Sequence, residues 1–502
     1  MNDTEFIPII GLEIHVQLKT ASKLFCSCST DEADPNSNVC EICLAYPGSM
    51  PSLNLEGVRK SIMAGIALNS HIADITSWDR KSYMYPDLFK GYQISQYDRP
   101  ICYDGNVEFI VRSRKNYYSS DAYIKRIGIF RAHLEEDTAK STHEGDFTYI
   151  DANKAGIPLL EIVTKPELYS VDEAVSFAKK VRDLMRWFDI SECDMEKGHM
   201  RFDANISICV NNPNIKSKSY EEWEDILFTP IVEIKNLNSF GNLEAALEYE
   251  IKRQIEEYKQ TGNLYSKGQK ETRGFDADKG ITYIQRKKEE ANEYRYIPEP
   301  DIPYLEITQE DIDQIKSQMG ITPLEAADSI RSDVPNISEY VIELILGERR
   351  LFDIYIDLKQ ETGLEPRKLI NLITNELKPD LDLLIDQQDK LSDWLNQIIQ
   401  VLIYFRDNKV SQNQLKIMFS KHQVGETDFE KLLSELKNDE VDIDLQSIVN
   451  TVVESNPSVV EQIKGGKESA KMFLVGQVMK ITKGKADPNE IKSLIDKKIN
   501  EI

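Results

Sequence analysis

A carboxylate and an imidazole lie two residues apart near the start of this sequence. Glu13 and His15, followed by Gln17, alternate with apolar residues between Ile10 and Leu18. Because successive side chains of a strand point to opposite faces, these polar groups are predicted to share one face above an apolar underside. Such a face is either solvated or a site for a metal ion and phosphate.

Later strand-like segments repeat this pattern of acids and bases. The residues concerned are Arg131, His133, Glu135, Glu136, Asp137, Glu161, Arg201, Asp203, Glu233 and Lys235. A carboxylate inside an apolar run, as at Glu161, is unfavourable unless it is paired or bound to a metal. Magnesium is commonly shared between carboxylates and substrate phosphates, and Arg or Lys contacts the phosphate oxygens. The repetition favours an ATP–magnesium site over a solvated sheet.

No Walker A or Gly-x-Gly-x-x-Gly motif occurs, which disfavours P-loop and Rossmann ATPases. The polar and aromatic stretch 78–98 contains Arg80, Lys81 and Lys90 among several tyrosines. These residues could stack on and charge-pair with a nucleotide or an RNA end. The alternative is a surface loop packed by its own tyrosines.

Four of the seven cysteines form two short pairs, Cys26 with Cys28 and Cys40 with Cys43. In a large cytosolic chain, such clustering is more typical of zinc ligands than of disulfides. Four thiolates would make a closed, structural site that fixes the conformation of the loop 26–43 after the first strand. The alternative is four reduced cysteines without a metal.

Length and composition predict two to four domains in a soluble, cytoplasmic protein. The chain has 502 residues, of which 41% are hydrophobic and 29% charged. The acidic N-terminus lacks the features of a signal peptide, and no apolar run is long enough for a membrane span. From about residue 306 the pattern becomes helical, and prolines near 298–303 mark the change.

The net charge of −24 would repel nucleic acid unless basic residues are concentrated locally. One segment meets this condition, because six lysines and a single acid, Glu468, lie between Lys464 and Lys485. Glycine-punctuated lysines on a small helical module suit contacts with a phosphate backbone. A solvated lysine face is the alternative.

Long motifs along the chain resemble those of one family. They include Gly-Leu-Glu-Ile-His-Val-Gln-Leu at 11–18, the cysteine pairs before Tyr-Pro-Gly at 46–48, Lys-Gly-Tyr-Gln-Ile-Ser-Gln-Tyr at 90–97, His-Leu-Glu-Glu-Asp at 133–137, Pro-Leu-Leu-Glu-Ile-Val at 158–163 and Val-Gly-Gln-Val-Met-Lys at 475–480. Over nearly its whole length the sequence resembles the B subunit of the bacterial-type glutamyl-tRNA(Gln)/aspartyl-tRNA(Asn) amidotransferase, the GatB/GatE family.

The resemblance implies an α+β fold in three parts. Residues 1–296 would form an antiparallel-sheet cradle similar to the catalytic domains of glutamine synthetase and guanidino kinases. Residues 297–405 would form an all-α domain, and residues 406–502 a small all-α tail that binds tRNA. ATP would phosphorylate the side-chain carboxylate of misacylated Glu-tRNA(Gln) or Asp-tRNA(Asn). Ammonia would then displace the phosphate to give Gln-tRNA or Asn-tRNA.

The resemblance also assigns roles to residues. The catalytic set would be Glu13, His15, Glu135, Glu161, Arg201 and Lys235. Magnesium would be held among Glu13, His15, Glu135, Glu136, Glu161 and Asp203, and zinc by Cys26, Cys28, Cys40 and Cys43. ATP would be contacted by Arg80, Lys81 and Lys90, and tRNA by Lys471, Gly476, Gln477, Lys480, Lys483 and Lys485.

The chain shows no Gly-Ser-rich amidase signature, so ammonia would have to come from a partner. The resemblance implies a heterotrimer with an amidase A subunit and a small C subunit. Two other hypotheses remain at this stage. One is a zinc-stapled, tRNA-binding adaptor without catalysis, and the other is a self-contained ligase that uses free ammonia on a small carboxylate.

Overall fold

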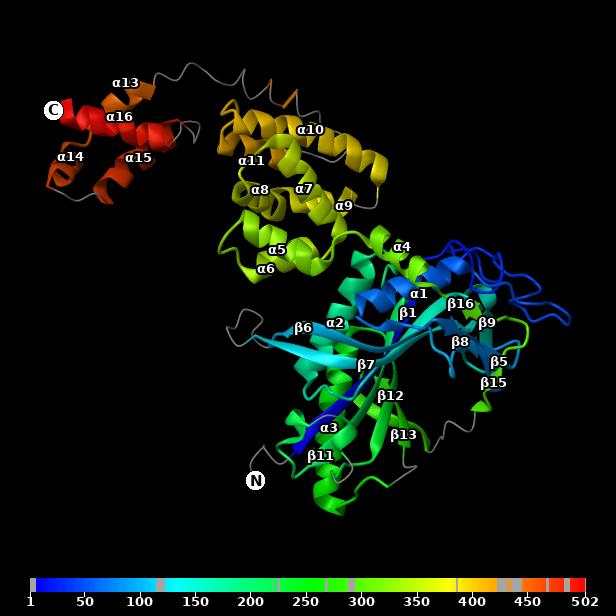
Figure 1. Cartoon of the computed structure of the whole chain (residues 1–502). Helices are drawn as coiled ribbons and strands as arrows, with labels where there is room; N and C mark the ends of the chain where they lie inside the picture. The colour runs from blue at the N-terminus through cyan, green and yellow to red at the C-terminus, as the bar shows by residue number, and fades with distance from the viewer. Residues whose placement is uncertain are drawn as a thin grey trace. The chain divides into compact units, whose positions relative to one another are not determined.

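A long central strand organises the first of two units in this computed structural model (Figure 1). The units are Met1–Pro323 and Leu324–Ile502. The structure describes residues 6–113, 122–218, 220–223, 226–266, 270–287, 294–384, 387–421, 431–432, 434, 445–465, 469–482 and 488–501. The first unit carries the sheet and the second is helical, so the predicted α+β class is confirmed at this level.

The principal sheet has nine strands in the order β14-β13-β12-β11-β1-β10-β7-β6-β2. Their bounds are β1 Phe6–Gln17, β2 His71–Ile72, β6 Cys102–Val111, β7 Tyr123–Glu136, β10 Pro158–Thr164, β11 Met200–Val210, β12 Ile231–Leu237, β13 Lys270–Asp276 and β14 Ile281–Lys287. Strand β1 lies at the centre, between β10 and β11, and pairs antiparallel with both.

One pair departs from the predicted antiparallel sheet, because β12 and β13 run parallel. Helix α3, Phe240–Thr261, connects these two strands. A helical crossover returns the chain in the same direction, so the two strands it joins are parallel. The sheet is therefore mixed at this edge.

The alternation of β1 sorts its side chains as the sequence predicts. Ile10, Leu12, Ile14 and Val16 are fully buried, whereas Glu13, His15 and Gln17 on the other face keep partial exposure. Period-two alternation in a strand places one set toward the core and the other toward the opposite face. The polar face is the one that carries the candidate site.

Three helices of the first unit pack on the strands. They are α1 Leu55–Ala67, α2 Val171–Trp187 and α3. Phe177 of α2 contacts Phe109 of β6, and Phe240 of α3 contacts Phe202 of β11. Phe202 lies opposite Ile14 in the register, so α3 covers the apolar face of the sheet. Helix α3 ends at Gly262, whose φ of +66° favours glycine.

Smaller elements complete this unit. They are β3 Ile75–Thr76 with β16 Leu305–Glu306, the sheet of β4 Asp79–Ser82, β5 Tyr92–Ser95 and β15 Ile297–Pro298, the hairpin β8 Lys140–Glu144 with β9 Phe147–Asp151, and α4 Gln309–Met319. Stretch 78–98, for which a loop was one interpretation, thus contains two short paired strands.

The second unit consists of helices throughout its described residues. Their bounds are α5 Pro323–Asp333, α6 Glu339–Leu346, α7 Arg349–Thr362, α8 Pro366–Leu372, α9 Lys378–Leu384, α10 Gln388–Arg406, α11 Gln412–Lys421, α13 Leu445–Glu454, α14 Pro457–Lys464, α15 Ser469–Ile481 and α16 Pro488–Glu501. Helices α13 to α16 share a core that includes Val452, Leu474 and Ile495. The division at 296 and 405 stays a prediction.

Membrane-spanning helices are absent from the part of the chain that the structure describes, since none of its helices combines the required length and apolarity.

Candidate metal and phosphate site

The first candidate metal group joins His15, Glu135 and Glu161 from three neighbouring strands. His15 on β1 lies opposite Glu161 on β10, and Glu161 lies opposite His133 on β7. The His15 Nε2 atom is 3.4 Å from a Glu161 carboxylate oxygen and 3.9 Å from one of Glu135. The His133 Nε2 atom is 3.4 Å from Glu161 and 3.7 Å from Glu135.

The second candidate group joins Glu13, Asp203 and Glu233, again from three strands. Glu13 on β1 lies opposite Asp203 on β11, and Glu233 follows on β12. The side-chain amide of Asn205 donates to Glu13 at 2.8 Å, and the backbone N–H of Asn236 donates to Asp203 at 2.8 Å. These bonds orient the carboxylates and leave further oxygen lone pairs available.

Both groups meet the distance requirement for a shared ion. Within each group, one ligand atom from every residue lies within 4.8 Å of the others. Octahedral magnesium with oxygen ligands at about 2.1 Å places opposite ligands about 4.2 Å apart. The donor set and these spacings therefore fit hard divalent cations.

Charge crowding on this face shifts several pKa values. Burial raises the pKa of Glu13, and the Glu161 and Glu233 carboxylates raise it further. Burial alone would favour neutral Glu161, but His133 and His15 hold the pKa of its carboxyl well below the usual range. Acids with opposite shifts in one site are typical of functional sites, and they also mark a face that attracts cations.

The same carboxylates favour the protonated form of the two histidines. Burial opposes the charge on His133, yet the carboxylates of Glu161 and Glu135 raise its pKa to about 9. The pKa of His15 is also raised, because its interactions with Glu161 outweigh burial. Two imidazoles thus neutralise part of the acidic cluster when no metal is bound.

Three of the predicted cationic residues lie beside these groups. The Lys235 ammonium is 3.4 Å from both Asp203 and Glu233, and Arg201 is 3.3 Å from Asp137. Lys81 lies over the ring of Tyr294 at 5.2 Å, and its pKa is raised because Glu135 and Glu161 outweigh the effect of burial. These cations bring positive charge next to the candidate metal groups.

Three other predicted residues are engaged elsewhere. The guanidinium of Arg80 forms a bidentate ion pair with the carboxylate of the buried Glu299, with N···O distances of 2.7 and 2.8 Å. Lys90 pairs with Glu136, which also accepts the backbone N–H of Ile94 at 2.9 Å. The structure therefore does not bring Glu136 into either metal group. It also leaves Arg80 and Lys90 satisfied by protein carboxylates.

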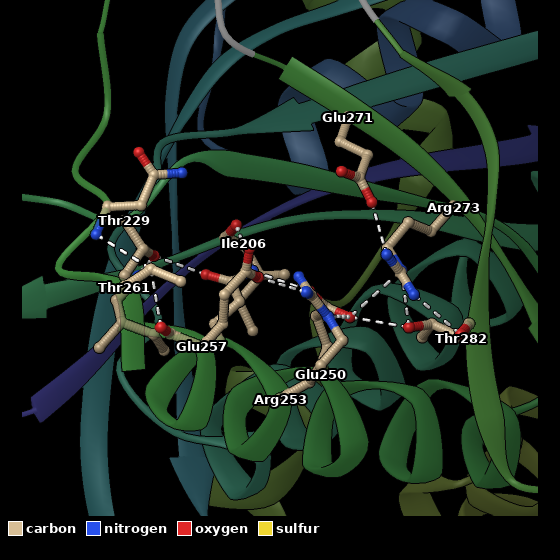
Figure 2. Close-up of polar contacts among 12 residues, drawn as sticks. Ile206, Thr229, Glu250, Arg253, Glu257, Thr261, Glu271, Arg273 and Thr282 are labelled. Carbon is tan, nitrogen blue, oxygen red and sulfur yellow. Dashed lines mark hydrogen bonds and ion pairs between the residues drawn. The ribbon is translucent and has the colours of Figure 1, made fainter. Parts of the chain in front are cut away.

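Helix α3 forms polar contacts with β13 and β14, the two strands that lie beyond the Glu233 strand β12 at this end of the sheet (Figure 2). The fully buried Glu250 accepts bonds from Arg253 and, at 2.8 Å, from Thr282 of β14. Thr282 in turn accepts from Arg273 of β13 at 2.8 Å. On the site face, Thr272 of β13 donates to Glu233 at 3.1 Å. The helix thus holds the strand that orients a site carboxylate.

The four clustered cysteines converge as the spacing of the two pairs predicts. Cys26, Cys28, Cys40 and Cys43 each offer a sulfur within 4.8 Å of the others, and all four are free thiols. The sulfurs of Cys40 and Cys43 are 3.9 Å apart. Tetrahedral zinc with Zn–S bonds of about 2.3 Å requires roughly 3.8 Å. The arrangement therefore fits zinc.

Thiol ionisation in this cluster is uneven. A hydrogen bond from Cys26 lowers the pKa of Cys43, and the nearby charge of Lys23 contributes. Burial raises the pKa of Cys28 to about 11. One thiolate is therefore favoured even before a metal is present, and a thiolate is the form that binds metal.

The predicted tRNA-binding residues divide between described and undescribed parts of the chain. Lys471 pairs with Asp496 at 2.6 Å, whereas Lys480 on the same helix α15 is exposed. Gly476 is exposed too, and a Cβ added there would meet nothing within 4 Å. Gln477 follows it, partly buried. Lys483 and Lys485 lie outside the described residues.

Sequence reasoning placed Glu233 and His133 among the polar residues that favour a metal site, but it gave no individual role to them or to Asn205. A signal was present for each, because all three lie at polar positions of strand-like segments. It could not reveal which strands pair. Lys23, a fully buried lysine whose ammonium donates to Cys43 at 3.6 Å, was missed entirely.

Fold and site together define an α+β protein whose main sheet carries two adjacent acidic groups suited to divalent cations, with a separate four-cysteine cluster. The model of the GatB/GatE catalytic domain matches residues 8–313, and the model of the GatB domain matches residues 353–499. The chain belongs to the GatB/GatE family.

Curated relatives match over nearly their full length, and the three that follow are B subunits of an aspartyl/glutamyl-tRNA(Asn/Gln) amidotransferase. The chain is 38% identical over 500 residues to the protein of Borreliella afzelii, covering 97% of this chain and 98% of the relative. It is 36% identical over 516 residues to the protein of Carboxydothermus hydrogenoformans, covering 99% and 100%. The relative from Persephonella marina is 36% identical over 500 residues, covering 98% and 99%.

Proposed function

We propose that this protein is the subunit that activates and amidates tRNA-bound glutamate or aspartate. It would convert Glu-tRNA(Gln), Asp-tRNA(Asn) or both into Gln-tRNA(Gln) and Asn-tRNA(Asn) with consumption of ATP. One observation carries the proposal: Glu13 and His15 of a single strand connect two acidic, metal-competent groups. The names of the relatives support the same activity.

The chemistry requires an activated carboxyl. A carboxylate reacts poorly with ammonia because oxide is a poor leaving group. Transfer of the γ-phosphoryl group of ATP to a carboxylate oxygen gives an acyl phosphate and ADP. Ammonia then adds to the acyl carbon, phosphate leaves with the C–O bond electrons, and a proton is lost to give the amide. These two steps are balanced in atoms and charge, and they need no reactant other than ATP, ammonia and the carboxylate.

The residues of the chain take roles that follow from their positions. The two groups would hold magnesium, which when bound neutralises phosphate charge and helps align the transfer in line. Lys81, Arg201 and Lys235 lie next to these acids and would bind phosphate oxygens. Lys235 would exchange its pairing with Asp203 for a phosphate contact when the substrate binds.

The finer architecture is part of the proposal. The sheet unit would be a cradle similar to the catalytic domains of glutamine synthetase and guanidino kinases, and the four cysteines would hold structural zinc. The exposed face of α15 around Gly476 and Lys480 would contact tRNA. An amidase A subunit and a small C subunit would complete a cytoplasmic heterotrimer and supply ammonia, which fits the designation of the relatives as B subunits.

One assay tests the activity. The protein is incubated with Glu-tRNA(Gln), ATP, magnesium and ammonium chloride, first alone and then with the partner subunits, and the esterified amino acid is identified. We expect glutamine on the tRNA only when ATP and magnesium are present. Binding of tRNA without turnover under all conditions would instead indicate the adaptor. Amidation of a small free carboxylate without tRNA would indicate a self-contained ligase.

A substitution tests the site. Glu13→Ala should abolish tRNA-stimulated ATP hydrolysis while the circular dichroism spectrum and melting temperature stay near those of the wild type. The control is Glu257→Gln, which alters an exposed acid on α3 away from both metal groups. Wild-type hydrolysis in Glu13→Ala would refute the site assignment.

A further inference from the structure

Lys23 lies at the junction between the cysteine cluster and the strands of the acidic site. It is 0% exposed, and its ammonium donates to the carbonyl of Asn38 at 2.8 Å, the carbonyl of Ala152 at 3.2 Å and the sulfur of Cys43 at 3.6 Å. An ammonium has three N–H donors, so these partners use all of them. The geometry fixes the side chain in one position.

A buried ammonium is unfavourable unless a negative charge compensates it. Two of the partners of Lys23 are neutral carbonyls, so only Cys43 can carry a formal charge. Four thiolates around a zinc ion carry a net charge of −2, and groups that hydrogen-bond to metal ligands stabilise such sites. The loaded cluster would therefore compensate the charge of Lys23, and Lys23 would offset half of the negative charge of the cluster.

The same lysine is tied to the strands that carry Glu135 and Glu161. Next to it, the N–H of Leu24 donates to the carbonyl of Gly156 at 2.8 Å, and the N–H of Gly156 donates to Asp137 at 2.9 Å. Gly156 leads directly into β10, which carries Glu161, and Asp137 follows β7, which ends with Glu135 and Glu136.

Gly156 lies close to both Lys23 and Cys43. Its φ is +87°, and a Cβ there would lie 3.5 Å from Cδ of Lys23 and 3.8 Å from Cβ of Cys43. These are ordinary van der Waals separations, so the stem of Lys23 and the cysteine loop lie next to the turn that begins β10. A shift of the lysine or of the loop would be transmitted to that turn.

We propose that Lys23 couples metal binding by the four cysteines to the geometry of Glu135 and Glu161. In the loaded cluster, the thiolate of Cys43 holds the ammonium, and the ammonium holds Ala152 and the turn before β10. Loss of the metal would leave at most the Cys43 thiolate to hold the lysine, would free the cysteine loop from its other anchors, and would thereby loosen the ends of β7 and β10. This inference rests on the proposed zinc at the cysteines.

The test compares three variants of the full chain. Lys23→Met keeps the length of the side chain without its charge, Lys23→Arg keeps the charge, and Lys19→Met removes a nearby surface lysine that pairs with Asp189 and Glu192. Zinc release is followed with a colorimetric chelator, and Mn²⁺ affinity at the acidic site by electron paramagnetic resonance. We expect about 10-fold faster zinc release and weaker Mn²⁺ binding in Lys23→Met. Lys23→Arg should show smaller effects, and Lys19→Met none.

Two further measurements separate coupling from a merely structural role. Stripping zinc from the wild type should weaken Mn²⁺ binding at the acidic site, and this measurement requires no variant to fold. Zinc should also raise the melting temperature of Lys23→Met less than that of the wild type. Equal gains in melting temperature, or unchanged Mn²⁺ affinity after stripping, would overturn the coupling. Wild-type protein purified without stoichiometric zinc would overturn the zinc assignment itself.

Discussion

Glu161 illustrates how single residues acquire a role in this protein. It interrupts the apolar strand β10, and its carboxylate lies 3.4 Å from both His15 and His133. Glu233 has an equivalent position in the second group, where it accepts from Thr272 and pairs with Lys235 and Lys270. At this scale the proposed function depends on which acids remain available to a cation.

Glu233→Gln should weaken the second group while leaving the first intact. The substitution preserves shape but removes one of three carboxylates, so we expect a loss of at least about 10-fold in Mg²⁺ affinity and a comparable fall in ATP hydrolysis. Isothermal titration with Mg²⁺ and a tRNA-stimulated ATPase assay measure both. Glu257→Gln serves as the control, and an unchanged Mg²⁺ titration would exclude Glu233 as a ligand.

The metal-free protein should lose stability as the pH rises from about 6.5 to about 9. The pKa of His133 is raised from 6.5 to about 9 by its carboxylate neighbours. A group whose pKa is higher in the folded than in the unfolded state stabilises the fold. This stabilisation is complete below the pKa of the unfolded state and is lost as the pH rises through the pKa of the folded state. Urea unfolding in EDTA at pH 6, 7.5 and 9 measures the effect.

The imidazole signals of His133 provide a direct check of this shift. They should titrate near pH 9 in nuclear magnetic resonance spectra of the metal-free protein, with His133→Gln used for assignment. A midpoint near 6.5 would contradict the prediction.

At the scale of elements, strand pairing creates the site and α3 supports its far edge. The register of β1 with β10 and β11 places His15 opposite Glu161 and Glu13 opposite Asp203. The parallel strand β13 is joined to α3 by the network around Glu250. A helix that covers the apolar face thus also fixes the strand behind Glu233.

Glu250→Gln should destabilise the sheet unit by about 3 kcal/mol, because it leaves Arg253 and Arg273 without their buried anion. Glu257→Gln removes the exposed partner of the same Arg253 and should change stability by less than about 1 kcal/mol. Thermal unfolding followed by differential scanning calorimetry compares the two. Similar melting temperatures for both variants would contradict the structural importance of the Glu250 network.

At the scale of the whole molecule, charge is distributed unevenly. The chain carries a net charge of −24, yet the candidate tRNA-binding helix α15 presents the exposed Lys480 beside Gly476. An open position at Gly476 would let a ligand approach the helix backbone closely. Binding of tRNA must then rely on local contacts, since long-range attraction to an acidic protein is unfavourable.

Lys480→Ala should lower tRNA affinity by roughly 3- to 10-fold and reduce the slope of log K against log salt by about 1, as expected for one lost phosphate contact. Filter binding over a range of salt concentrations measures both values. Lys279→Ala removes an exposed lysine of the sheet unit as a control. An unchanged slope would exclude a phosphate contact by Lys480.

Alternation and spacing in the sequence determined the polar face of β1, the convergence of the four cysteine sulfurs and the helical character of the second unit. These features follow from local periodicity and short-range geometry. The tertiary structure alone decided which polar strands meet. It brought Glu233, Asn205 and His133 into the site. It also showed that Arg80 forms an ion pair with Glu299 and that Lys90 forms one with Glu136. These outcomes depend on contacts between residues far apart in the chain, where local pattern carries no information about partners.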